Sequence, residues 1–134
     1  MNKVLWAGLV LLVSSSAWAG TEHYVGRNGN HVQHLKINQV GADINVAMDV
    51  DFEPNGSAEE GRKPCSADIA GEARKTGENT LVLKKQAEGE AHYCSLTITT
   101  SSEGAKVDQS ADCKYFAAGI CYFDSDGREL TRVK

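Results

Sequence analysis

Strict alternation of apolar and polar residues dominates this chain and predicts β-strands. The longest example is 44–52, where five apolar residues alternate with Asn, Ala and Asp. The same period of two recurs in 65–73 and 94–100, and no window of ten or more residues carries a helical stripe. Successive side chains of a strand point to opposite faces, so each segment would bury one face. Shorter alternating segments are 81–84, 105–108, 120–123 and 130–133.

Turn dipeptides divide these segments into hairpins. Asn28-Gly29 and Asp126-Gly127 are preferred pairs for two-residue hairpin loops of type I′, because both loop positions need a positive φ. The second loop would pair 120–123 with 130–133. About eight short strands with such turns indicate an all-β fold, a small disulfide-bonded antiparallel barrel or sandwich, with at most one short helix near 115–119.

The first 19 residues predict a secretory signal peptide. Lys3 precedes an apolar run at 4–13, and Ala17-Trp18-Ala19 forms a small-residue cleavage site. A membrane anchor would need about 20 apolar residues, whereas this run breaks at 14–16, which are all serine. Cleavage would leave one domain, 20–134, in the periplasm or secreted and without a membrane span.

All four cysteines lie in the predicted exported part, and an even count there predicts two disulfides. A four-thiolate zinc site would normally show C-x-x-C pairs, and the sequence has none. Three pairings are possible. We favour Cys113–Cys121 with Cys65–Cys94, because the first closes a short glycine-containing loop and the second joins two predicted strands with inward-facing cysteines.

Composition and motifs exclude several classes of function. The chain has 14 Lys plus Arg against 18 Asp plus Glu and a net charge of -4, which argues against nucleic-acid binding, since that needs clustered basic residues. It lacks the G-x-S-x-G elbow, the phosphate-binding glycine loop, H-E-x-x-H and the dinucleotide fingerprint. The sequence therefore predicts a binding protein that is not an enzyme and has no cofactor.

Two groups of residues raise the question of a metal. An Asn28-Gly29 loop would put His23 opposite His34, and two imidazoles could hold Zn²⁺ or Cu²⁺. The alternative is two polar residues on a solvated hairpin. Alternating acids from Asp49 resemble the start of a calcium loop, but Pro54 stands where that loop needs glycine, so a solvated acidic strand face is the simpler interpretation.

Residues Ser101–Val107 resemble part of a known family. Their sequence, Ser-Ser-Glu-Gly-Ala-Lys-Val, is similar to the loop of the periplasmic and membrane-bound inhibitors of C-type lysozyme. In that family a Ser-Gly-x-x-Tyr loop on a small disulfide-bonded β-barrel enters the lysozyme cleft. Gly104 matches this pattern, whereas Glu103 replaces the Ser and Val107 replaces the Tyr. The resemblance implies a hydrolase inhibitor, with Glu103, Gly104 and Lys106 as candidate contacts.

The acidic strand face suggests a second contact. Asp49, Asp51 and Glu53, followed by Glu59 and Glu60, would steer a basic partner by long-range attraction. The same carboxylates would also serve solubility and discourage edge pairing. We therefore expect a periplasmic inhibitor or immunity-type protein that blocks a lysozyme-like hydrolase or a toxin and binds a basic periplasmic protein. The alternative is a small envelope domain that binds a ligand or a metal ion.

Overall fold

The computed structural model describes residues 20–54, 64–86, 91–116 and 120–133. The predicted signal peptide and residues Glu59 and Glu60 lie outside these ranges. The described residues form a closed antiparallel barrel in which each strand pairs with the next and β8 pairs with β1. The strands are β1 (Gly20–Asn28), β2 (His31–Val40), β3 (Asp43–Phe52), β4 (Cys65–Gly77), β5 (Thr80–Gln86), β6 (Tyr93–Thr100), β7 (Gly104–Gln109) and β8 (Leu130–Val133). The all-β prediction is confirmed, and the architecture is the barrel.

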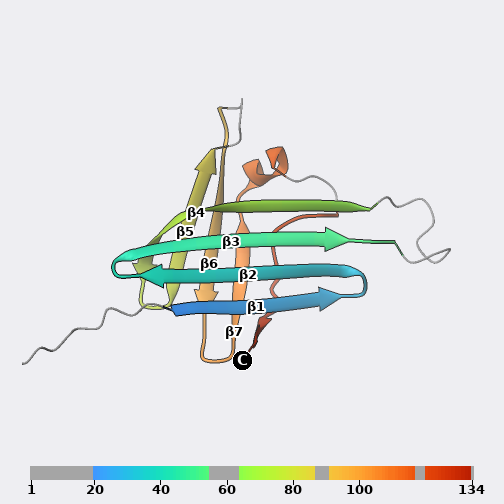
Figure 1. Cartoon of the computed structure of the whole chain (residues 1–134). Helices are drawn as coiled ribbons and strands as arrows, with labels where there is room; N and C mark the ends of the chain where they lie inside the picture. Colours follow the sequence, from blue (N-terminus) through green and yellow to red (C-terminus); the bar gives the residue numbers. More distant parts are fainter. Residues whose placement is uncertain (1–19, 55–63, 87–90, 117–119, 134) are drawn as a thin grey trace, which may run out of the picture.

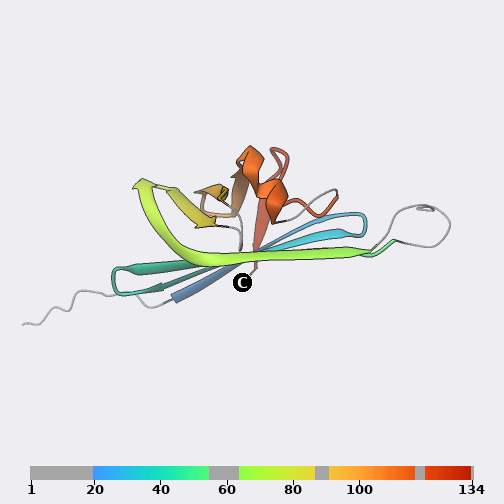
Figure 2. The same ribbon diagram turned by 90° about the horizontal axis from the view of Figure 1, so that it is seen from above.

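The barrel is flattened into two layers. Strands β1 to β4 lie side by side in one layer, and β5 to β7 cross them steeply in the other (Figure 1). Figure 2 shows β4 bending from the first layer toward the second. Residues 65–73 of β4 pair with β3 in the first layer, and residues 73–77 pair with β5 in the second.

The inward halves of the alternating strands fill the core. All five apolar residues of 44–52 are buried, as the alternation predicts. Leu96 and Ile98 of β6 are fully buried on the facing layer, together with Leu83 of β5. Burying each side chain of this size contributes about 1.5–3 kcal/mol. Burial of these inward-facing apolar side chains is thus the main stabilisation of the closed barrel.

The first hairpin forms one residue later than predicted. Its loop is Gly29-Asn30, and Asn28 pairs with His31. Gly29 has a φ of 65°, which suits the first position of a type II′ loop, where glycine is preferred. Moving the loop by one residue shifts the register by two, so His23 pairs with Lys36 and not with His34. Both histidines keep their outward face.

The predicted hairpin at Asp126-Gly127 is wrong, although its turn forms. Both residues have a positive φ, and Arg128 N donates to Ser125 O at 2.9 Å. Residues 120–123, however, form no strand, and β8 pairs with β1 and β7.

Two glutamines explain this difference. Gln33 Nε2 donates to the carbonyl oxygens of Tyr122 and Asp124 at 3.1 and 2.9 Å. Phe123 N donates to Gln109 Oε1 at 2.8 Å. Side chains from other strands therefore satisfy the backbone groups that a hairpin ladder would have used.

Two disulfides form, as predicted, but the predicted pairing is wrong. The bonds are Cys65–Cys121 and Cys94–Cys113, with Cα–Cα distances of 6.2 and 4.2 Å. Cys65 begins β4 and Cys94 lies in β6, and β5 separates these two strands in the barrel. Cys65 and Cys94 are therefore not neighbours. The alternation showed that both face inward, but it could not show which strands lie side by side.

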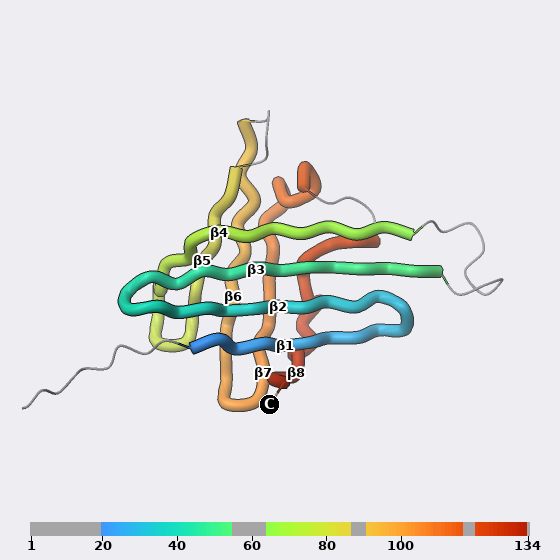
Figure 3. Tube along the Cα trace, viewed as in Figure 1, coloured from blue at the N-terminus to red at the C-terminus, as the bar shows by residue number. Residues whose placement is uncertain are grey.

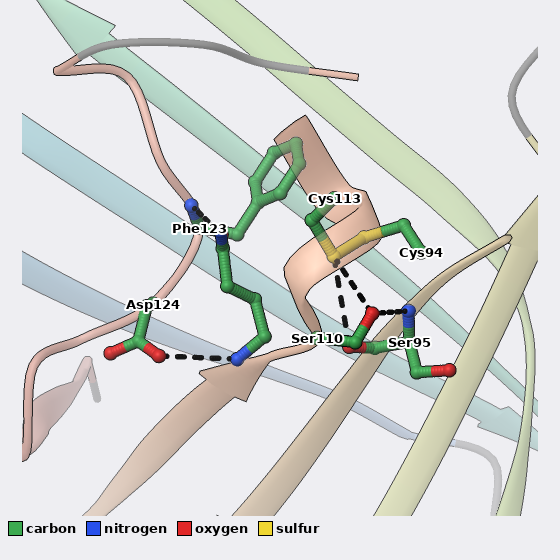
Figure 4. The surroundings of a disulfide bond; sticks show 7 residues. Cys94, Ser95, Ser110, Cys113, Phe123 and Asp124 are labelled. Carbon is green, nitrogen blue, oxygen red and sulfur yellow. Dashed lines mark hydrogen bonds between the residues drawn. A yellow bond between two sulfur atoms is a disulfide. The ribbon is translucent and has the colours of Figure 1, made fainter. Parts of the chain in front are cut away.

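A short 3-10 helix, η2 (Ala111–Tyr115), brings Cys113 to the start of β6. Ser95 N donates to Ser110 Oγ at 3.0 Å beside this disulfide (Figure 4). The helix lies just before the stretch in which one was expected, and residues 117–119 are outside the described ranges. The bond and the serine pair together fasten η2 to the barrel.

Candidate functional site

The outer surface of β3 and β4 carries a group of exposed carboxylates, which we call the acidic face: Asp49, Asp51, Glu53 and Asp68. Asp49 and Asp51 point outward between buried residues of β3, and Glu53 is exposed directly after it. Asp68 of β4 lies directly opposite Asp49. Sequence analysis missed Asp68, although the alternation of 65–73 already put it on the outward face.

The acidic face brings two carboxylates into direct opposition. Like charges directly opposite one another in an antiparallel pair are destabilising. Across the described ranges, no Lys, Arg or His nitrogen lies within ion-pair distance of these four carboxylates, and the ion pairs there are His92–Asp112 and Arg132–Glu22. The pair Asp49–Asp68 therefore concentrates negative charge, and the imidazole of His34 lies opposite Asp49 on its other side.

Closure of the barrel removes one explanation for these acids. Charged residues often protect an unpaired strand edge, but residues 44–52 of β3 pair with both β2 and β4. Edge protection is therefore not needed at Asp49 or Asp51. Solubility and attraction of a basic partner remain as explanations.

The segment that resembles the inhibitor loop forms the tight turn 101–103 between β6 and β7 and the first four residues of β7. Ser101 N donates to Gly104 O at 2.8 Å, and Gly104 N donates to Ser101 Oγ at 3.1 Å. Glu103 and Lys106 are exposed, whereas Gly104 is buried. A Cβ on Gly104 would lie 2.5 Å from Leu130 O. Packing against β8 therefore accounts for this glycine, and contact of the three residues with a partner stays a prediction.

The structure does not bring the two predicted contact regions together. Strand β3 neighbours β2 and β4, whereas β7 neighbours β6 and β8. Three strands separate β3 from β7 in either direction round the barrel, as the path of the chain in Figure 3 shows. The acidic face and the β6–β7 turn are thus separate surfaces.

The two histidines meet despite the changed register. His23 Nε2 lies 3.2 Å from His34 Nδ1, a hydrogen bond between the rings. Partial burial lowers the pKa of His23, and the neighbouring His34 and Lys36 lower it further. In the described parts of the chain, no group of three or more His, Cys, Asp or Glu residues is placed to hold a metal ion. A site on the two histidines alone stays a prediction.

Comparisons with known proteins found no relative of this chain. No family model, curated protein or solved structure matches the chain. Among the described residues, no helix has the length and apolar character needed to cross a membrane. Function is therefore inferred from the surfaces of the barrel itself.

Proposed function

We propose that the protein is an exported, non-catalytic inhibitor or immunity-type protein that binds a basic cell-wall hydrolase or toxin through its acidic face. The observation that supports this most is the Asp49–Asp68 pair on two strands that are not edges. Such a like-charge pair destabilises a sheet by about 0.2–1 kcal/mol. A basic group from a partner would remove that penalty on binding. The free energy that the repulsion costs the free barrel would then favour the complex.

Rigidity of the acidic face favours this role. Asp49 and Asp51 are held by ladders on both sides, so little backbone entropy is lost when a partner binds. A Lys or Arg about 4 Å from one carboxylate gains roughly 1 kcal/mol in water and up to about 4 kcal/mol near a protein surface. Several such contacts mainly raise the association rate and the specificity for basic partners.

The predicted export and the two disulfides agree with a function outside the cytoplasm. Disulfides persist in oxidising compartments such as the periplasm or outside the cell, and the sequence predicts a signal peptide ahead of the barrel. Hydrolases that act on anionic cell walls tend to be basic, so charge attraction suits them. The resemblance at Ser101–Val107 suggests a C-type lysozyme as the first partner to test.

Equilibrium binding to a basic C-type lysozyme, measured by titration calorimetry, tests the proposal. We expect the double variant Asp49→Asn/Asp68→Asn to bind about tenfold more weakly or worse, which corresponds to at least about 1.4 kcal/mol. Asp43→Asn is the control for the loss of a carboxylate elsewhere on this strand, because Asp43 is exposed on the same face at the far end of β3. Equal weakening by the control, or no effect of the double variant, would contradict the assignment of the acidic face.

A further inference from the structure

One end of the barrel is hollowed into a cavity of about 330 Å³, which we call the mouth cavity. It lies between the start of β1 and the β4–β5 turn, at the end of the barrel away from η2 (Figure 1). Its apolar lining consists of Ile37, Ile44 and Leu81, which are 7 to 9% exposed, whereas the other core residues are 0 to 2% exposed. Solvent therefore reaches the apolar core at this end.

Charged side chains at inward positions surround this apolar floor. Glu22, Lys75 and Arg132 line the cavity, and each lies two residues from an inward-facing neighbour: Tyr24, Ala73 and Leu130. Inward charges break the alternation that builds the core, and such breaks in an otherwise consistent pattern mark functional sites. An apolar pocket with a few convergent polar groups is the usual form of a small-ligand site.

The guanidinium of Arg132 has more hydrogen-bond donors in the mouth cavity than its contact with Glu22 uses. Its Nη2 lies 3.5 Å from Glu22 Oε2, while Tyr24 Oη donates to Glu22 Oε1 at 2.7 Å. Glu22 is thus engaged at both oxygens. A guanidinium carries five N–H donors in a planar fork, and its preferred partner is a carboxylate bound at two points. An anionic ligand could therefore bind Arg132 without displacing Glu22.

Removal of the signal peptide would shift the charge balance at the mouth in favour of an anion. Lys75 lines the cavity as a second cation, and the exposed Glu78 at its rim is a second carboxylate, so these four charges balance. Gly20 lines the cavity as well. If cleavage occurs after Ala19, as the sequence predicts, the new α-ammonium of Gly20 adds a third positive charge. Signal-peptide removal would then complete the site.

We propose that the mouth cavity binds a small monocarboxylate with an apolar tail. The carboxylate lies on Arg132, assisted by Lys75 and the Gly20 ammonium, and the tail lies on Ile37, Ile44 and Leu81. Ligand cavities span roughly 300–1,000 Å³, so this one suits a molecule of about ten non-hydrogen atoms. The inference is independent of the acidic face, which lies on the outer surface of β3 and β4.

Three eight-carbon probes test the proposal: octanoate, octanol and octylamine. The protein is purified from the periplasm after expression of the full chain, and mass spectrometry establishes its N-terminus. We expect octanoate to bind with a dissociation constant of about 0.1–1 mM, octanol at least tenfold more weakly, and octylamine more weakly still. Binding of octanol as tight as octanoate, or binding of none of the three, would overturn the proposal.

Variants assign the interaction to its residues. Arg132→Gln should weaken octanoate binding at least tenfold and leave octanol unchanged. Arg128→Gln is the matched control, because Arg128 does not line this cavity. Methyl NMR shifts on octanoate addition should be confined to Ile37, Ile44, Leu81 and their contacts. Unchanged octanoate binding by Arg132→Gln, or shifts elsewhere, would show that the carboxylate is not recognised here, whether or not the protein binds lysozyme.

Discussion

Replacing Gly104 by alanine separates a packing role from a contact role in the β6–β7 turn. A Cβ at this position would meet both Glu129 Cγ and Leu130 O. The Glu129 side chain can move, but Leu130 O belongs to the backbone of β8, which also pairs with Ala105. Relief of the contact thus requires β8 to shift. Such overpacking typically costs about 1–3 kcal/mol.

Urea unfolding followed by circular dichroism measures this cost. We expect Gly104→Ala to lower the free energy of unfolding by about 1–3 kcal/mol and the melting temperature by roughly 4 °C or more per kcal/mol. Gly77→Ala is the control, since its new Cβ would make only ordinary contacts, 3.5 Å or more from Thr80, and should be nearly neutral. If Gly104→Ala unfolds like the native protein and fails only in lysozyme binding, the packing explanation is wrong.

Three further outcomes follow from the same structure. Asp68→Asn should raise the free energy of unfolding by about 0.2–1 kcal/mol, because it removes the like-charge pair with Asp49; a loss of stability would argue against repulsion. Non-reducing peptide mapping should join the fragment containing residue 65 to that containing 121, and 94 to 113. Since the folded state lowers the pKa of His23, stability should fall as pH drops below about 6.5, less steeply in His23→Gln; identical pH profiles would contradict this.

Alternation predicts much of this fold because it is a local property. Each of β3, β4 and β6 includes a segment that its period of two singles out, and the buried residues are those of the predicted inward phase. The exposure of Asp49 and Asp51 follows from the same phase. None of these conclusions needs knowledge of which strands are neighbours.

The errors concern partners that are distant in the chain. The disulfide pairing depends on β5 lying between β4 and β6, and the sequence does not show this order. The expected hairpin at 120–133 fails because Gln33 and Gln109 bond to the backbone of 122–124. Turn chemistry at Asp126-Gly127 was correct, but turn chemistry does not choose the strand that pairs.

The same distinction between local and distant information applies to the candidate sites. Asp49, Asp51 and Glu53 could be named from one segment, whereas the Asp49–Asp68 pair requires the register of β3 with β4. The mouth cavity collects Lys75 and Arg132 from strands that are far apart in the sequence. The alternation places both residues in the inward phase of their strands, but it does not show that they lie near one another.

The rate at which a basic C-type lysozyme associates with the protein, measured by stopped flow between about 0.02 and 0.5 M salt, tests the central claim most directly. The Debye length is about 8 Å at 0.15 M ionic strength, so attraction by the acidic face should weaken steeply over this range. The native rate should start at least tenfold above that of Asp49→Asn/Asp68→Asn and approach it at high salt. Rates for the two proteins that coincide at every salt concentration would contradict recognition through the acidic face.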